Sequence, residues 1–174
     1  QKITELARQK GILSLVDVAQ SAGIIPIDLQ QWQAGFVVGS SVKWIGGGPG
    51  AAFLWVDPEI VEQCQPNNVG WFSHQNPFEF DIHHFRYAAD ALRFWGGTPS
   101  VYPFAVAANS LAQINAMGVD KIRANNVALS DKIIQAIPAS VLISPRSEAQ
   151  RGGTLVLNFA QYQEQVVSRL NASQ

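Results

Sequence analysis

The first 56 residues alternate between helical and extended patterns of apolar and polar positions. A polar helix is predicted to end at Gly11, and the nearly continuous apolar run at 12–16 is typical of a strand buried on both faces of a parallel sheet. Residues 24–29 are predicted to form a short extended piece that leads into a helical turn. Two further strands are predicted at 36–39 and 51–56. This alternation of helices and strands indicates an α/β fold.

The middle of the chain loses this regularity. Asp57 and Pro58 predict the start of a helix, with the carboxylate as its cap and the proline at its first position. Residues 65–100 follow no clear period and are rich in aromatic residues, Asn, Pro and Gly. An irregular segment of this length inside a compact domain is usually functional or held in place by a partner.

Regular patterns return in the last third of the chain. Helices are predicted at 101–117 and 120–137, separated at Gly118, and two short strands at 141–144 and 154–159. These elements favour a second, smaller α+β domain.

The chain is therefore expected to divide near Tyr102, into an α/β part at 1–102 and a small, incomplete domain at 103–174. Both ends of the sequence fall inside helical patterns and lack a start or cap signal. This suggests a segment of a longer protein.

The composition narrows the class of protein. Hydrophobic residues make up 47% of the 174 positions and charged residues 14%, which is enough apolar material for a large core. The net charge of −1 argues against a nucleic acid or an anionic membrane as partner. Cys64, the single cysteine, excludes an internal disulfide and suits a reducing compartment such as the cytoplasm. No apolar run reaches the length of a membrane span.

The most informative side chains follow two of the predicted strands. Asp17 ends the first apolar run, Lys43 comes shortly after the second, and a glycine-rich turn follows at 46–50. Enzymes that use pyridoxal phosphate (PLP) need such a pair, because an amine forms an imine with the cofactor aldehyde and a carboxylate pairs with the pyridinium nitrogen. Taken singly, each residue has an ordinary explanation, since most lysines are solvated and aspartates often cap turns.

The glycines do not match a nucleotide-binding fingerprint, because Lys43 precedes them. We expect them to adopt positive φ and to allow close packing beneath a cofactor. Gln20 lies on the same turn as Asp17, where its amide could reach a cofactor oxygen or simply be a loop amide.

Histidine and arginine supply the remaining candidates. No third ligand at a recognisable spacing accompanies His83 and His84, so no metal site is predicted. His74 stands among aromatic residues and is the more interesting histidine. Arg151, just before a predicted strand, offers a guanidinium that can bind a substrate carboxylate through two hydrogen bonds, with Arg146 as the competing candidate and a surface charge as the ordinary alternative.

Together these pieces resemble the class V group of fold-type-I PLP enzymes, and within it the kynureninases most. The resemblance covers almost the whole chain. The matching segments are Asp17-Val18-Ala19-Gln20, Ser40-Ser41-Val42-Lys43, Gly70-Trp71-Phe72-Ser73-His74, Arg93-Phe94-Trp95-Gly96-Gly97-Thr98-Pro99, and the stretch from Ser144 to Gly152.

The resemblance implies a fold and a cofactor. Residues 1–102 would be the end of a large domain with a three-layer α/β/α sheet, and residues 103–174 part of a small α+β domain. PLP would be the cofactor, held covalently by Lys43 as a Schiff base. Asp17 would bind its ring nitrogen, Gln20 would lie near its phenolic oxygen, and Ser40 would be a further cofactor-binding residue.

The resemblance also implies a shared active site. Trp71 and Thr98 would reach the PLP of the neighbouring subunit, so a homodimer would be needed for activity. Arg151 would bind the α-carboxylate of an amino-acid substrate, and His74 would also contact substrate. The phosphate-binding turn and the aromatic residue that stacks on the cofactor ring would lie upstream of this sequence.

The implied reaction is that of kynureninases, which hydrolyse a Cβ–Cγ bond to give alanine and an anthranilate. Two positions depart from their pattern. Gln20 stands where kynureninases usually carry His, and Val42 stands where they carry Tyr. These departures favour a class V aminotransferase or a cysteine desulfurase as the alternative enzyme, although Cys64 lies in the wrong region for a desulfurase nucleophile. A non-catalytic, dimerising relative is the alternative of a different class.

Overall fold

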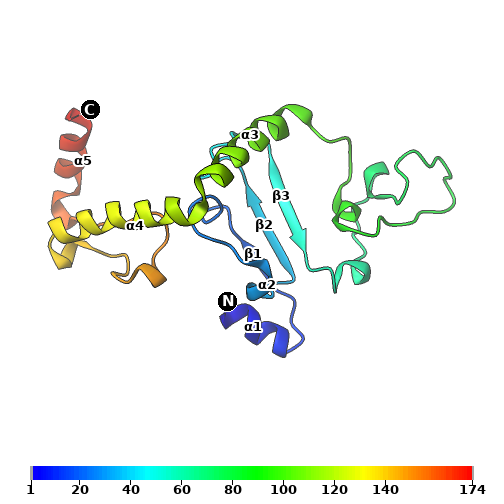
Figure 1. Ribbon diagram of the computed structural model, residues 1–174, viewed down its shortest axis with the longest axis horizontal. Helices are drawn as coiled ribbons and strands as arrows, with labels where there is room; N and C mark the ends of the chain where they lie inside the picture. The colour runs from blue at the N-terminus through cyan, green and yellow to red at the C-terminus, as the bar shows by residue number, and fades with distance from the viewer. Residues whose placement is uncertain (1, 174) are drawn as a thin grey trace.

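A three-stranded mixed sheet lies at the centre of the computed structural model, which describes residues 2–173 (Figure 1). The strands are β1 (Leu15–Asp17), β2 (Phe36–Ser40) and β3 (Ala52–Val56), in that spatial order. β1 and β2 are parallel, and Asp17 pairs with Val38. β3 is antiparallel to β2. The α/β class expected from the sequence is confirmed for this part, and the order of its strands along the chain is as predicted.

Five α-helices accompany the sheet in the described residues. They are α1 (Lys2–Gln9), α2 (Leu29–Trp32), α3 (Val101–Met117), α4 (Val119–Ala136) and α5 (Gln163–Ala172). Short 3-10 turns lie at Val61–Gln63, Trp71–Ser73, Ala91–Phe94, Ala139–Val141, Glu148–Gln150 and Ala160–Tyr162. α3 and α4 meet at Gly118, whose φ of +84° is one that favours glycine. The predicted break between two helices at Gly118 is confirmed.

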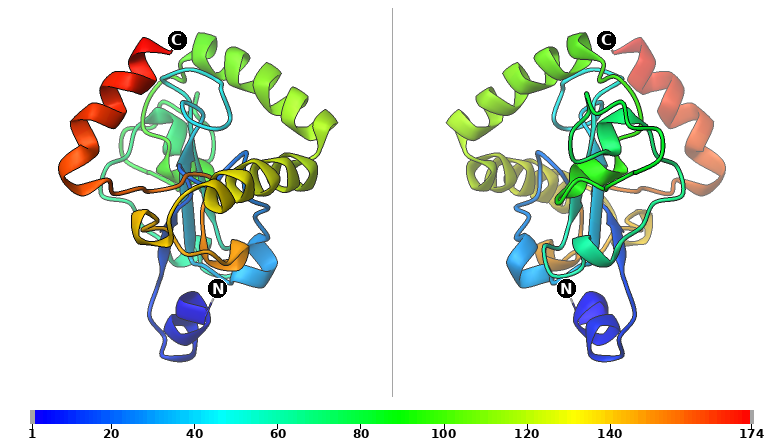
Figure 2. Two further views of the ribbon diagram at one scale, coloured as in Figure 1. Left: turned by 90° about the vertical axis from the view of Figure 1, so that its left-hand side faces the viewer. Right: turned by 90° about the vertical axis from the view of Figure 1, so that its right-hand side faces the viewer.

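The helices are distributed unevenly around the sheet. α3 crosses the end of the sheet toward which β2 points, while α4 and α5 extend to one side and the segment 65–100 to the other (Figures 1 and 2). The Ser110 hydroxyl donates a hydrogen bond of 3.1 Å to the carbonyl of Gly46, which fixes α3 against the turn after β2. The turn after β2 therefore lies between the edge of the sheet and α3.

The core is small and lies beside β2. Its buried members come from β2, from the turns on either side of it and from the turn after β1: Val18, Ala22, Ala34, Val37 and Ile45. Burial of apolar surface stabilises by roughly 25 cal/mol per Å², so this cluster holds together the two turns that follow β1 and β2. Many large apolar side chains elsewhere are exposed, including Leu15 and Phe53 on the outer strands.

One expectation about the sheet is wrong. Leu15 is 62% exposed, so β1 is not buried on both faces. β1 is an edge of the three-stranded sheet and has no further neighbour in the described residues. β3, for which the sequence predicts no direction, runs antiparallel to β2.

Two other elements differ from their predictions. No α-helix starts at Asp57, whose carboxylate accepts the amide of Glu59 at 3.0 Å and forms an ion pair of 2.9 Å with Arg8. These contacts fix a tight turn instead. The strands predicted at 141–144 and 154–159 shrink to a single antiparallel bridge, between Leu142 and Leu157.

The irregularity predicted for 65–100 is confirmed, since its described residues form only 3-10 turns and one isolated bridge. The boundary near Tyr102 stays a prediction. No helix among residues 2–173 is long and apolar enough to cross a membrane.

Candidate functional site

Asp17 and Lys43 lie at the same edge of the sheet. Asp17 is the last residue of β1, and Ser40 is the last residue of β2. Because β1 and β2 are parallel, their carboxyl ends meet at one edge, which is where open α/β sheets bind their ligands. Lys43 follows Ser40 by three residues and is exposed, as is Asp17. The pair that the sequence singled out is thus brought to one place.

The turn that carries Lys43 is held by hydrogen bonds of its own backbone. The amide of Gly46 donates to the Lys43 carbonyl at 2.9 Å, and the amide of Gly47 donates to the Ser41 carbonyl at 2.8 Å. The Ser41 hydroxyl, which is buried, lies 2.9 Å from the carbonyl of Gly48. Gly46 and Gly48 have φ values of +69° and +73°, which confirms the expected positive φ in this turn.

The turn after β1 packs directly against this Lys43 turn. A Cβ atom on Gly23 would lie 3.0 Å from the backbone nitrogen of Ile45 and 3.1 Å from the carbonyl carbon of Trp44. Gly23 also has a φ of +92°, so glycine is needed there for two reasons. The backbone contact sets the spacing between the Asp17 and Lys43 turns.

The polar groups at this edge suit PLP. The Asp17 carboxylate accepts the amide of Ala19 at 2.8 Å, which orients it, while its exposure leaves it accessible to a ligand. Gln20 is exposed on the same turn, and Ser40 is half-buried at the end of β2. The edge therefore offers an amine that can bind the aldehyde, a carboxylate that can accept from the ring nitrogen and an amide that can donate to the phenolic oxygen of this cofactor.

Trp71 and Thr98 form a second group, on segments that lie side by side. The Ser73 hydroxyl donates to the carbonyl of Trp95 at 2.7 Å and accepts the amide of Gly70 at 3.0 Å. Trp71 and Thr98 are both exposed. In Figure 1 the segment 65–100, which carries both residues, projects from the side of the sheet opposite to α4.

His74 is directed inward. It is 6% exposed, and its ring packs edge-on against Phe85 with centroids 5.2 Å apart. Its Nδ1 lies 2.8 Å from the carbonyl oxygen and 3.0 Å from the amide nitrogen of Asn76. Its Nε2 is buried and has no hydrogen-bond partner among residues 2–173. Contact with a substrate stays a prediction for this residue.

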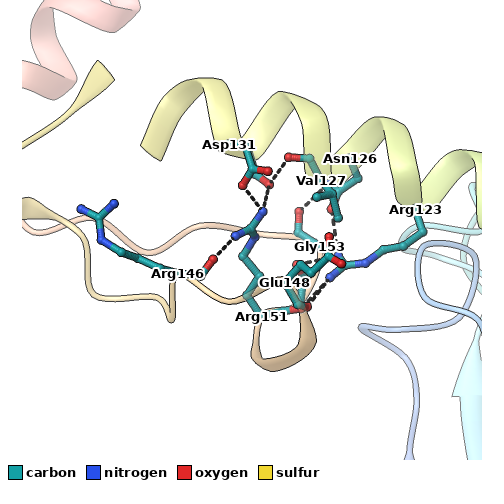
Figure 3. Close-up of polar contacts among 10 residues, drawn as sticks. Arg123, Asn126, Val127, Asp131, Arg146, Glu148, Arg151 and Gly153 are labelled. Atoms are coloured by element: carbon teal, nitrogen blue, oxygen red, sulfur yellow. Dashed lines mark hydrogen bonds and ion pairs between the residues drawn. The ribbon is translucent and has the colours of Figure 1, made fainter. Parts of the chain in front are cut away.

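Arg151 is buried against α4 rather than open to solvent (Figure 3). Its guanidinium forms an ion pair with Asp131, donates to the Ser130 hydroxyl at 3.1 Å and donates to the carbonyl of Arg146. Its Nε is buried without a partner in the described part of the chain. The Arg146 side chain points away from this cluster (Figure 3). Both terminal nitrogens of the Arg151 guanidinium are thus engaged, so a substrate carboxylate that bound two of its nitrogens would displace at least one of these partners.

The sequence reasoning missed the residues that hold this loop. Arg123 and Asn126, both on α4, donate to backbone carbonyls between residues 148 and 153. Both lie in a polar stretch that is typical of a solvated helix face, so no local pattern distinguishes them. Ser41 was also missed as the residue that fixes the Lys43 turn, and a small hydroxyl residue beside a glycine-rich turn was the available signal.

His83 and His84 do not gather with other ligands. The His84 ring lies 2.7 Å from the carboxylate of Asp81. The amide of His83 and then this ring keep the pKa of Asp81 below its ordinary value. Within residues 2–173 no group of three or more His, Cys, Asp or Glu side chains has a metal-binding arrangement.

A groove of about 840 Å³ lies between the β2–β3 face and the segment 90–95, and its lining includes Gly39, next to Ser40, and Gly50, in the turn after Lys43. Its walls are apolar, with Phe53, Phe94 and Phe104 among them, and none of the predicted site residues lines it. The groove therefore adjoins the Lys43 turn, while Asp17 and Lys43 themselves lie outside its lining.

Comparisons with known proteins identify the family of the chain. Residues 1–174 match the aminotransferase class-V family. The chain is 30% identical to kynureninase from Pseudomonas fluorescens over 87% of this chain and 38% of that protein. It is 37% identical to the uncharacterized aminotransferase YcbU of Bacillus subtilis over 70% of this chain and 31% of that protein. The chain thus spans less than half the length of these relatives.

Solved structures show the same fold. The chain superimposes on the apo cysteine desulfurase of Thermococcus onnurineus with a TM-score of 0.83 and 20% identity, over 99% of this chain and 43% of that one. A mutant of C-DES with glycine covalently linked to its PLP cofactor gives a TM-score of 0.72 and 19% identity, over 93% of this chain and 43% of that one.

The fold and the sheet edge define a segment of a fold-type-I PLP protein. The chain belongs to the aminotransferase class-V family. Members of this family depend on PLP, so both the family and the cofactor suggested by the sequence are confirmed. The described residues contain a three-stranded mixed sheet, while the three-layer arrangement and the small C-terminal domain stay predictions.

Proposed function

We propose that the full-length protein is a PLP-dependent enzyme that transforms amino acids, with Lys43 as the residue that holds the cofactor. The observation that carries this proposal is the convergence of the Asp17 turn and the Lys43 turn at the carboxyl edge of β1 and β2. Their backbones touch at Gly23, so the carboxylate and the amine are held by one packed unit.

Each residue at the edge has a distinct part. PLP, when bound, supplies a ring that withdraws electrons from the substrate Cα. The Lys43 amine would hold the cofactor covalently and, once released, carry the Cα proton on Nζ. The Asp17 carboxylate would hold the proton of the ring nitrogen in place, with its own orientation set by the Ala19 amide. Gln20 and Ser40 would complete the contacts at this edge.

The two proposed substrate-binding residues, Arg151 and His74, would have to change their present contacts to bind a substrate. Arg151 would bind the α-carboxylate after exchanging its ion pair with Asp131, whose side chain is 46% exposed and can move into water. His74 would need to expose its buried Nε2. The buried polar atoms on both side chains support this proposal, because an unpaired buried donor or acceptor is costly and a ligand would satisfy it.

Kynureninase-like hydrolysis of a Cβ–Cγ bond, giving alanine and an anthranilate, is the reaction that we propose first. Its support is the similarity to kynureninases across most of this chain. A class V aminotransferase is the second candidate, supported by Gln20 and Val42, which lack the imidazole and the hydroxyl usual in kynureninases. A desulfurase fits less well, because the Cys64 thiol is half-buried and lies 3.3 Å from the carbonyl of Ile60.

Borohydride reduction of the full-length protein loaded with PLP, followed by peptide mapping, tests the central assignment. We expect the reduced cofactor to be found attached to Lys43, as a label on that peptide. Lys43→Ala should lose both this label and the absorption of the covalently bound cofactor. Label on another lysine would overturn the assignment. Absence of any such absorption in the native protein would favour the non-catalytic alternative.

A further inference from the structure

Hydrogen bonds from α4 hold the loop at 148–153, which lies next to the Lys43 turn. Arg123 donates to three backbone carbonyls of this loop, at 2.8 Å to Glu148, 3.0 Å to Arg151 and 3.1 Å to Gly152 (Figure 3). Backbone carbonyls that accept from a guanidinium form charge-assisted hydrogen bonds, which are stronger than neutral ones. The loop at 148–153 is thereby fixed to the helix through its main chain.

The far end of this loop touches the residue after Lys43. The Asn126 amide donates to the carbonyl of Gly153 at 2.9 Å. A Cβ atom on Gly153 would lie 2.9 Å from Cζ2 of Trp44 and 3.0 Å from Cγ1 of Ile24. The backbone of Gly153 therefore packs directly against the indole of Trp44 and against Ile24, which lies in the turn after Asp17.

We propose that Arg123 and Asn126 are positioning residues for Lys43, acting through Gly153 and Trp44. This inference rests on the proposed function in one respect, the role of Lys43 as the cofactor lysine. Trp44 is bonded directly to Lys43, so a displacement of the indole moves the backbone from which the lysine side chain extends. Reacting groups tolerate little displacement, since an error of about 1 Å can lower a rate by about a hundredfold.

Two adjacent glycines provide a matched test. Gly153→Ala pushes a methyl group onto Trp44 and Ile24, while Gly152→Ala meets nothing within 4 Å, and neither has a positive φ. In the cofactor-free full-length protein we expect Gly153→Ala to speed hydrogen exchange of the Gly46 and Gly47 amides about tenfold, because opening of the turn becomes easier. Gly152→Ala should leave these amides unchanged.

A second pair acts from the helix side. Arg123→Met removes the three guanidinium hydrogen bonds to the loop, leaves that of Asn126 and keeps a long side chain. Lys132→Met makes the same change of charge at an exposed position of α4. We expect Arg123→Met to speed exchange at Gly46 and Gly47, Arg123→Lys to restore part of the protection, and Lys132→Met to have no effect. The amides that pair β2 with β3 should keep their protection in every variant.

The outcomes separate this inference from the proposed function. Faster exchange at Gly46 and Gly47 in both Gly153→Ala and Arg123→Met supports it, whichever lysine takes the borohydride label. Unchanged exchange at these two amides, with only a lower unfolding midpoint, would make the contact purely structural and overturn the inference. Uniformly faster exchange across β2 and β3 would also overturn it, because the effect would then be global destabilisation.

Discussion

At the residue scale, the carboxylate of Asp17 is the clearest test of the electronic role assigned to the sheet edge. Asp17→Asn keeps the shape of the side chain and an oxygen that can accept the Ala19 amide. We therefore expect the unfolding midpoint to change little and turnover to fall by two or more orders of magnitude, on the order of 3 kcal/mol of transition-state stabilisation. Turnover near that of the native protein would show that Asp17 only caps its turn.

Arg151 is the residue for which the structure changes the prediction most. If the guanidinium binds an α-carboxylate after exchanging Asp131, Arg151→Lys should weaken amino-acid binding by about 2–5 kcal/mol, because an ammonium group cannot form two parallel hydrogen bonds. Asp131→Asn should then strengthen binding, since the competing charge is removed. Titration with amino acids, followed by the absorption of the bound cofactor, measures both.

A purely structural role for Arg151 predicts a different result. If Arg151→Lys and Asp131→Asn both lower the free energy of unfolding and leave amino-acid affinity unchanged, then Arg151 only holds the loop against α4. Asp131 precedes Arg151 by 20 residues, so their pairing could not be predicted from local sequence. By contrast, Asp17 and Lys43 could be located from the sequence, because each follows an apolar run that defines the end of a strand.

At the scale of elements, Gly70 and Gly97 make a second matched pair. A Cβ atom on Gly70 would collide with the carbonyl of Gly96, whereas one on Gly97 would meet nothing within 4 Å. Because the collision is with backbone, we expect Gly70→Ala to lower the free energy of unfolding by about 1–3 kcal/mol and Gly97→Ala to leave it nearly unchanged. Urea denaturation measures this, and equal effects would mean that the two segments are not held together.

The elements show which parts of a fold follow from local pattern. α3 and the break at Gly118 could be predicted, because a long helical run and a glycine that tolerates positive φ are local signals. The turn at Asp57 could not, since its carboxylate is taken by Arg8, which is 49 residues away. The direction of β3 could not be predicted either, because the sequence of a five-residue strand does not indicate whether it runs parallel or antiparallel to its neighbour.

At the scale of the whole molecule, the candidate residues fall into two separate groups. Asp17 and Lys43 share the sheet edge, while Trp71 and Thr98 lie on the segment 65–100, which projects on the far side from α4 (Figure 1). We propose that the two groups meet in a homodimer, in which each subunit offers Trp71 and Thr98 to the Lys43 site of its partner.

Mixing two inactive variants tests this arrangement. In a hybrid dimer of Lys43→Ala with Thr98→Ala, a shared site carries either both substitutions or neither, so one of the two sites is native. Random exchange of subunits makes half of the dimers hybrid, and about a quarter of all sites should regain full turnover. The measurement is turnover after unfolding and refolding the two variants together, compared with each refolded alone. If both residues serve the same subunit's site, every site keeps a substitution, and the mixture should stay as inactive as its components.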